Sequence, residues 1–141
     1  MSERLDRLAA YFACISEATL PQLREFYAPD AYFKDPFNEV RDIGVIEHIF
    51  ADMYVSLRDP RFVIHSKVAQ GDEAFLTWDF NFRIKKYKPD VTQIIRGSSH
   101  LKFDEQGRVC YHRDYWDAAE ELYEKLPIVG GLMRFLKKRV G

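Results

Sequence analysis

The strongest constraint on the fold is the stretch from Leu76 to Lys85, where apolar and polar residues alternate without interruption. The apolar positions are Leu76, Trp78, Phe80, Phe82 and Ile84, and the polar positions are Thr77, Asp79, Asn81, Arg83 and Lys85. Successive side chains of a strand point to opposite faces of a sheet. The stretch therefore predicts an antiparallel strand with one face on a core and the other toward water.

Further strands are predicted on both sides of this stretch. Period-two patterns cover residues 62–68, 91–103 and 108–116, and turns are expected at 70–73 and 104–107. In the strand over 91–103, Gly97 and Ser99 share a face with larger apolar residues. We expect these small residues to leave room in front of the sheet. Two shorter strands are predicted near residues 32–35 and 39–43.

Helical patterns precede most of the strands. Apolar residues at helical spacing predict an amphipathic helix over residues 3–17, a shorter helix after Pro21, and a third helix from Gly44 that stops before Arg58. Residues 27–30 are expected to end the second helix. Helices followed by a run of antiparallel strands indicate an α+β fold, in which helices cover one face of a curved sheet. Such a sheet forms a cone that is open at one end.

Composition restricts the class of protein. The length of 141 residues fits one domain, and the net charge of −1 argues against general binding of polyanions such as nucleic acid. Cys14 and Cys110 make neither a disulfide framework nor a metal cluster, so we expect reduced thiols in a cytoplasmic protein. The N-terminus lacks a signal peptide, and no apolar run is long enough to span a bilayer. Aromatic residues make up 15% of the chain, a surplus that fits a pocket lining.

The segment from Tyr32 to Phe37 places Asp35 among aromatic residues and just before Pro36. Burial in such a setting penalises the charged form of an acid, which raises its pKa and makes it a better proton acceptor near neutral pH. The alternative interpretation is an ordinary Asp-Pro turn. The local sequence does not decide between the two.

Several short motifs, in this order, resemble those of the nuclear-transport-factor-2-like (NTF2-like) superfamily, and within it the ketosteroid isomerase-like (SnoaL-like) proteins. The motifs are Phe26-Tyr27-Ala28-Pro29-Asp30-Ala31, Lys34-Asp35-Pro36, Gly71-Asp72-Glu73-Ala74 and His100-Leu101-Lys102-Phe103. The resemblance implies a cone of curved antiparallel sheet on three helices, a deep apolar pocket and a homodimer. It covers residues from about 3 to 117, and we expect a domain over residues 1–117 with residues 118–141 as a C-terminal helical extension of the same domain.

The resemblance also implies roles for individual residues. Asp35 matches the catalytic base, and Tyr11 matches the tyrosine of the first helix that donates to a developing oxyanion. Ser99 stands where the isomerases carry a protonated Asp, so the pair of strong donors is broken. His112 and Asp114 are expected to face the pocket and to titrate together with Asp35. The other interpretation of His112 and Asp114 is a satisfied polar pair at the rim.

The remaining site predictions concern the pocket wall and its surroundings. We expect substrate contacts from the side chains of Ser99, Trp78, Phe80, Phe82, Trp116, Phe50 and Met53. His65 and His100 are interpreted as exposed strand histidines, and His112 with Asp114 is too small a set for a metal site. The basic helix near residues 132–139 is interpreted as packing on the barrel or on a dimer partner, with a lid or a membrane contact as alternatives.

These observations lead to one main hypothesis and two alternatives. The main hypothesis is an isomerase, or a lyase or hydrolase, that uses Asp35 as general acid/base on a small, largely apolar ligand, with cyclic compounds among the candidates. It needs no cofactor and no metal. The alternatives are a non-catalytic module that binds a small molecule in the same cone, and a dimerisation module whose cone is filled by its own side chains.

Overall fold

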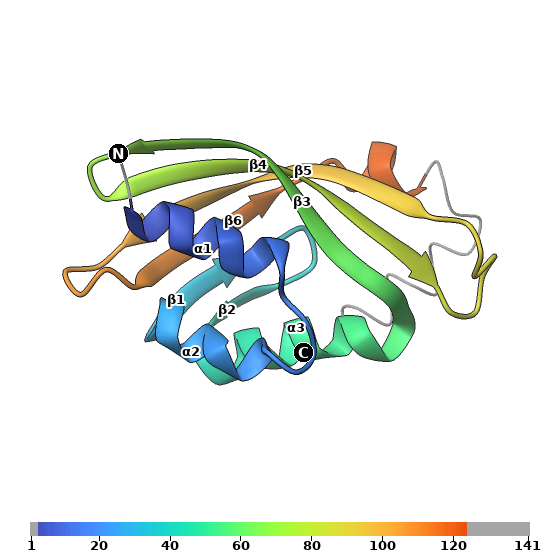
Figure 1. Cartoon of the computed structure of the whole chain (residues 1–141), viewed down its shortest axis with the longest axis horizontal. Helices are drawn as coiled ribbons and strands as arrows, with labels where there is room; N and C mark the ends of the chain where they lie inside the picture. The colour runs from blue at the N-terminus through green and yellow to red at the C-terminus, as the bar shows by residue number, and fades with distance from the viewer. Residues whose placement is uncertain (1–2, 124–141) are drawn as a thin grey trace.

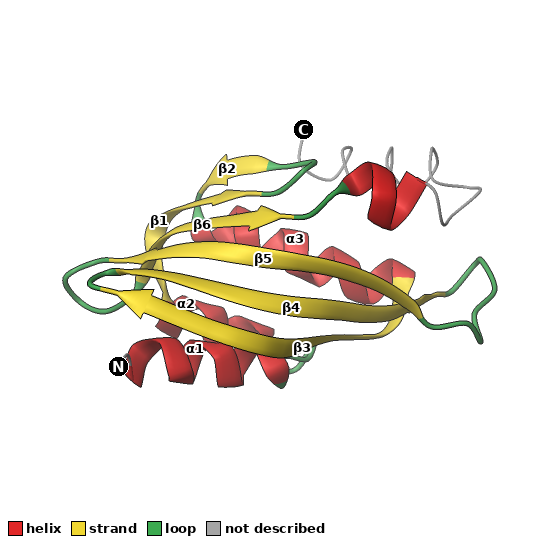
Figure 2. Cartoon of the chain, turned by 90° about the horizontal axis from the view of Figure 1, so that it is seen from above, coloured by secondary structure: helices red, strands yellow, loops and turns green. Residues whose placement is uncertain are grey.

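The computed structural model describes residues 3–123, which form one curved, unclosed sheet with helices against one face (Figure 1). The strands are β1 (Tyr27–Lys34), β2 (Glu39–Arg41), β3 (Leu57–Gln70), β4 (Glu73–Ile84), β5 (Gln93–Phe103) and β6 (Val109–Tyr115). The helices are α1 (Glu3–Ala13), α2 (Leu23–Phe26) and α3 (Ile43–Ser56), with a 3-10 turn at Leu20–Gln22 and a π-helical turn at Ala119–Tyr123. Seen from above, α1, α2 and α3 all lie behind the sheet (Figure 2). The predicted α+β cone is confirmed.

The strand order in the sheet is β2-β1-β6-β5-β4-β3. Consecutive strands from β3 to β6 pair antiparallel, as predicted, and so do β1 and β2. The pair β1 and β6 is parallel, with Tyr32 opposite Tyr111 and Phe33 opposite His112. The expectation of a wholly antiparallel sheet is corrected at this pair. Hairpin turns reveal pairing between neighbours in sequence, whereas β1 and β6 are joined by most of the chain.

The alternation in β4 has the predicted consequence. Leu76, Trp78, Phe82 and Ile84 are buried, and the intervening polar residues remain at least partly exposed. The buried face lies in one core cluster together with residues of α1 and α3, such as Phe12 and Phe50. Burial of this apolar surface is the main source of stability for a sheet with one wet face.

Two predicted boundaries near the N-terminus move. Helix α1 ends at Ala13 rather than at residue 17, because Ser16 and Thr19 form a local turn: the Ser16 backbone N–H donates to Thr19 Oγ1 over 2.9 Å. Hydroxyl side chains that bond to nearby backbone compete with the helix in this way. Residues 28–30, predicted as a helix end, belong to β1 instead.

Two further boundaries change around α3. Strand β2 stops at Arg41, because Asp42 caps the N-terminus of α3 by accepting from the backbone N–H groups of Gly44 and Val45. Strand β3 begins directly after α3 and includes residues 58–60, which precede the strand predicted over 62–68. An outermost strand tolerates this irregular segment, because one of its edges forms no ladder and Pro needs no partner there.

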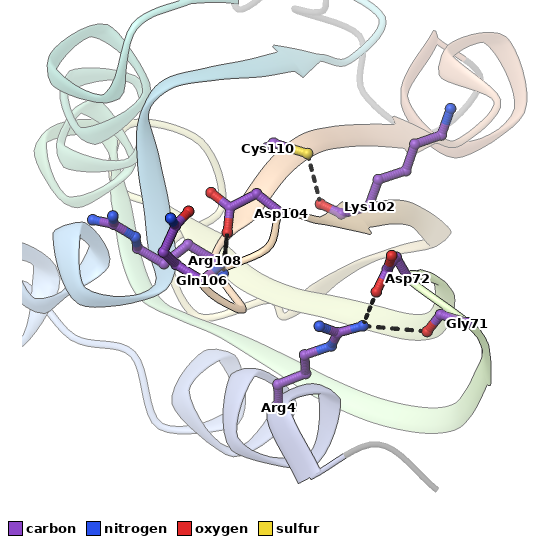
Figure 3. Close-up of polar contacts among 8 residues, drawn as sticks. All are labelled: Arg4, Gly71, Asp72, Lys102, Asp104, Gln106, Arg108 and Cys110. Carbon is purple, nitrogen blue, oxygen red and sulfur yellow. Dashed lines mark hydrogen bonds and ion pairs between the residues drawn. The ribbon is translucent and has the colours of Figure 1, made fainter.

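The end of α1 near the N-terminus is fixed to the hairpin between β3 and β4. The Arg4 guanidinium donates to the carbonyl oxygen of Gly71 over 3.3 Å and to Asp72 Oδ1 over 2.6 Å (Figure 3). In the neighbouring hairpin, Asp104 Oδ1 accepts from the backbone N–H groups of Gln106 and Arg108. These contacts hold the hairpin end of the sheet. Among residues 3–123, no helix is both long and apolar enough to cross a bilayer.

Candidate functional site

A cavity of about 130 Å³ lies between α3 and the inner face of the sheet. Its wall is built mainly from aromatic and aliphatic side chains: Phe33, Phe37, Ile49, Phe50, Met53, Leu57, Phe62, Trp78, Phe80, Phe82, Ile95 and Trp116. The polar residues on the wall are Asp35, Asn38, Asp52, Ser56 and Asp114. A cavity of about 150 Å³ lined by apolar side chains holds a benzene molecule. The volume therefore suits a ligand of about one ring.

The structure brings together most of the residues that were predicted to contact substrate. Trp78, Phe80 and Phe82 contribute from β4, Phe50 and Met53 from α3, and Trp116 from the segment after β6. Period two explains the set from β4, because the face that packs on the core continues into the cavity wall. Phe62 of β3 was not predicted, although it stacks on Phe80 with ring centroids 4.7 Å apart.

Asp35 lies on the cavity wall and also makes the turn that was its alternative interpretation. Its Oδ1 accepts from the backbone N–H groups of Phe37 and Asn38 over 2.8 and 2.7 Å, and its Oδ2 accepts from Asn38 Nδ2 over 3.0 Å. Burial raises the pKa of Asp35, and the charge of Asp114 raises it further, while the three hydrogen bonds act in the opposite direction. The predicted direction of the pKa shift agrees with the structure.

Asp114 lies at the centre of a chain of hydrogen bonds that spans four strands. Its Oδ1 accepts from Ser99 Oγ over 2.6 Å and lies 2.6 Å from His112 Nε2. Ser99 Oγ in turn accepts from Trp78 Nε1 over 2.9 Å. On the far side, His112 Nδ1 lies 2.6 Å from the Tyr27 hydroxyl. The second oxygen of Asp114 has no hydrogen bond within the described chain, and the residue lines the cavity.

The residues predicted to face inward from β6 do not all reach the cavity. Asp114 and Trp116 line the cavity, whereas His112 is only 3% exposed and lies behind Asp114. Tyr27, at 1% exposure, was not predicted as part of the site. Its one sequence signal was its place in the Phe26-to-Ala31 motif, because nothing local in a strand indicates a bond to a residue 85 positions away.

Two predicted oxyanion donors lie elsewhere, which corrects the expected geometry. The Tyr11 hydroxyl donates to the backbone carbonyl oxygens of Thr19 and Leu20 over 3.1 and 3.3 Å, and Tyr11 does not line the cavity. Burial is the main cause that raises the pKa of Tyr11 to about 12. Ser99 also lies behind the wall, where its hydroxyl is used by Asp114 and Trp78. The room expected in front of Gly97 is filled by the Trp78 indole, since a Cβ on Gly97 would lie 2.5 Å from Trp78 Cη2.

Three polar residues of the wall, Asn38, Asp52 and Ser56, were missed altogether. Asp52 is 5% exposed on α3, with Oδ2 3.7 Å from His48 Nε2, and it stands among apolar residues of the helix. Asn38 is also 5% exposed, and its Oδ1 has no hydrogen-bond partner in the described chain. A lone acid on an apolar helix face was the available signal for Asp52. For Asn38 there was only its position in the turn that follows Asp35.

The other two histidines of the strands lie away from the cavity. His100 lies on the outer face of the sheet, where its Nε2 is 2.6 Å from Glu73 Oε2 and its ring stacks on Phe75. His65 Nε2 lies 3.1 Å from Asp79 Oδ2, and its side chain is half exposed. Within residues 3–123, no three His, Cys, Asp or Glu side chains are grouped as metal ligands. The basic helix predicted near 132–139 lies outside the described residues.

Comparison with known proteins agrees with this architecture. The family model of the SnoaL-like domain matches residues 8–112. None of the curated proteins searched matches the sequence.

Solved structures with the same fold carry several descriptions. An LEH-like epoxide hydrolase of M. tuberculosis superposes with a TM-score of 0.71 and 16% identity, over 95% of each chain. A Shewanella putrefaciens CN-32 protein classed as a SnoaL-like polyketide cyclase superposes with a TM-score of 0.73 and 19% identity, over 91% of this chain and 98% of that one. A hypothetical protein of Catenulispora acidiphila DSM 44928 with a ketosteroid isomerase-like fold, in complex with trimethylamine, superposes with a TM-score of 0.71 and 15% identity, over 87% of this chain and 92% of that one. At these identities the likeness shows the fold alone.

Proposed function

The chain belongs to the SnoaL-like domain family, and we propose that it is an enzyme in which Asp35 and Asp114 handle a proton on a small, largely apolar, cyclic substrate. The reaction class is isomerisation, or lyase or hydrolase chemistry. Members of this fold are described as polyketide cyclases and epoxide hydrolases, which supports the class of chemistry without naming a substrate.

One observation carries the proposal: two carboxyl groups from separate elements line one apolar cavity in different surroundings. Asp35 is held by a turn and has a raised pKa, and Asp114 is held by side-chain donors behind the wall. Pairs of acids in different environments commonly divide the roles of acid and base. Neither carboxylate has a Lys or Arg partner among the described residues, and the His112 ring bonds only to Oδ1 of Asp114, which leaves the second oxygen of Asp114 without a hydrogen bond there.

The two carboxyl groups receive different tasks in this proposal. Asp35, whose raised pKa brings it nearer to neutral pH, takes a proton from substrate carbon or from water and returns it in a later step. Asp114 uses its second oxygen to accept a hydrogen bond from a substrate hydroxyl or from the attacking water. Tyr11 and Ser99 take no part as oxyanion donors, so we favour reactions in which the carboxyl groups themselves move the proton.

The test is turnover of a panel of cyclic ketones, enones and epoxides by the wild type and by Asp35→Asn and Asp114→Asn. General acid–base catalysis contributes about 10²- to 10⁴-fold, so each variant should lose at least about 100-fold in kcat/KM. Asp30→Asn is the matched control, because Asp30 is exposed and lies outside the cavity. Unchanged turnover in both cavity variants would refute the catalytic roles.

A second candidate is a non-catalytic module that binds a small amine cation. The cavity wall carries the carboxyl groups of Asp35, Asp52 and Asp114 among aromatic rings, and no Lys, Arg or His of the described chain lines it. A buried carboxylate needs a counter-charge, and aromatic faces attract cations. The trimethylamine complex of the C. acidiphila protein gives independent support for an amine in this fold.

Calorimetric titration with ligands matched in ring size separates this candidate from the first. Cyclohexylammonium should bind at least about ten-fold more tightly than cyclohexanol, a difference of about 1.4 kcal/mol. Asp114→Asn should remove the preference while leaving the affinity for cyclohexanol similar. Equal binding of both ligands by the wild type would eliminate the amine site. Cation binding without turnover of the panel would favour the module over the enzyme.

A further inference from the structure

In the chain of hydrogen bonds behind Asp114, the donor and the acceptor of each bond can be assigned by starting from Tyr27. Tyr27 is 1% exposed, and its hydroxyl contacts His112 Nδ1 as its one hydrogen-bond partner in the described chain. A buried hydroxyl that fails to donate loses free energy comparable to that of a hydrogen bond. The Tyr27 hydroxyl therefore donates, and His112 Nδ1 accepts.

The next bond follows from the first. A neutral imidazole carries its proton on one nitrogen, and the bond made by the other nitrogen decides which. Because Nδ1 accepts from Tyr27, the ring proton lies on Nε2, which donates to Asp114 Oδ1 over 2.6 Å. The Ser99 hydroxyl donates to the same oxygen, since Ser99 Oγ already accepts from Trp78 Nε1. Donors from both sides thus converge on Asp114 Oδ1.

The surroundings of His112 reinforce this tautomer. Its side chain is 4% exposed, and Phe12 of α1 and Phe33 of β1 contact the ring with centroids 6.0 and 4.9 Å away. Tyr27 from β1 and Asp114 from β6 are the titratable groups that bond to it. A second ring proton on Nδ1 would face the hydroxyl of Tyr27, whose own proton would then have no acceptor. Burial also raises the pKa of Tyr27 well above its ordinary value, so the hydroxyl keeps its proton.

We infer that Tyr27 is a positioning residue of the site: its hydroxyl fixes His112 as the neutral Nε2–H tautomer, and His112 thereby holds Asp114 Oδ1 and leaves Oδ2 free to contact substrate. The inference rests on the proposed function only in the use of Asp114 by the reaction. The tautomer and the orientation of Asp114 are properties of the protein without any ligand.

The test is ¹⁵N NMR of the imidazole nitrogens of wild type, Tyr27→Phe and Tyr11→Phe. In the wild type we expect the His112 ring proton on Nε2, with Nδ1 showing the shift of a hydrogen-bonded acceptor. Tyr27→Phe should move the Nδ1 signal to that of an acceptor without a donor. Tyr11→Phe removes the hydroxyl of another buried tyrosine outside the network, and should leave the His112 signals unchanged.

Kinetics add a second measurement, made with a compound that is turned over. Tyr27→Phe should lower kcat about ten-fold, the lower end of the about 10- to 100-fold loss found when the partner that orients a metal-bound His is removed, while KM changes less than two-fold. Finding the wild-type proton on Nδ1, or unchanged His112 signals in Tyr27→Phe, would overturn the inference whatever the activity. The wild-type spectrum alone decides the tautomer if the variant does not fold. Loss of the proposed function would instead appear as full activity in Asp114→Asn.

Discussion

Gly97 shows how a single residue sets the position of the cavity wall. A Cβ atom at this position would lie 2.5 Å from Cη2 and 2.8 Å from Cζ2 of the Trp78 indole. The indole cannot simply move away, because its Nε1 donates to Ser99 Oγ and its ring packs against Phe62. Glycine at 97 therefore lets Trp78 lie flat on β5 and direct its N–H toward the residue that holds Asp114.

Gly97→Ala should consequently destabilise the protein. Overpacking of a tight core site costs about 1–3 kcal/mol, and we expect a loss of this size in the free energy of unfolding measured with urea. Ser98→Ala, on the outer face of the same strand, should stay within about 0.5 kcal/mol of the wild type. In a Trp78→Phe background the cost of Gly97→Ala should be smaller, because the atoms that clash are absent. Equal costs in both backgrounds would show that the indole is not the cause.

At the scale of elements, α3 connects fold stability with the site. Five of the cavity residues lie on this helix: Ile49, Phe50, Asp52, Met53 and Ser56. Its N-terminus is capped by Asp42, whose Oδ1 accepts from the backbone N–H groups of Gly44 and Val45 over 2.7 and 3.1 Å. A side-chain oxygen in this place satisfies donors that a helix start otherwise leaves open.

Removal of this cap should weaken the fold by a modest amount. Asp42→Ala is expected to lower the free energy of unfolding by about 1 kcal/mol, and Asp42→Ser, which restores a side-chain acceptor, should recover most of the loss. Urea denaturation of the three proteins provides the measurement. If Asp42→Ser is as unstable as Asp42→Ala, the loss comes from the charge of Asp42 and not from the cap.

The elements were predictable from sequence wherever their signal was periodic. Leu76 to Ile84 identified the central strand and its inner face, and the apolar spacing in α1 and α3 identified the helices. Contacts over long sequence distances carried no such signal. The parallel pairing of β1 with β6, the bond from Tyr27 to His112, and the turn that brings the carbonyls of Thr19 and Leu20 to Tyr11 all depend on tertiary packing. For this reason Asp35 and Asp114 were identified as cavity residues, whereas the partners that orient Asp114 were only partly identified.

At the scale of the whole molecule, the candidate site places Asp35 where the fold would be more stable without its charge. Asp35 has a pKa above its ordinary value, with burial as the largest cause and the charge of Asp114 as a further one. The folded protein therefore binds a proton at Asp35 more tightly than the unfolded chain does. Functional groups held in unfavourable surroundings are a common reason why stability and activity conflict.

The sign of the pH dependence follows from linkage. The contribution of Asp35 to stability is fully present below the unfolded-state pKa of about 3.9 and is lost as pH rises through the higher folded-state pKa. Asp35→Asn removes this loss of stability at higher pH, because the amide side chain does not ionise. The Asn side chain keeps an oxygen for the backbone N–H groups of Phe37 and Asn38, and the Asn38 amide can turn to offer Oδ1, which has no partner in the described chain, to the new N–H.

Urea denaturation between pH 4 and pH 8 measures this effect. As pH rises, the free energy of unfolding of Asp35→Asn should increase relative to that of the wild type. At pH 8 the variant should be at least as stable as the wild type. Asp30→Asn, an exposed control on β1, should show no such trend. A difference for Asp35→Asn that stays constant with pH would mean that the folded and unfolded chains bind the Asp35 proton equally well. The cavity would then impose no electrostatic cost on that acid, and the reason for assigning it the role of base would be lost.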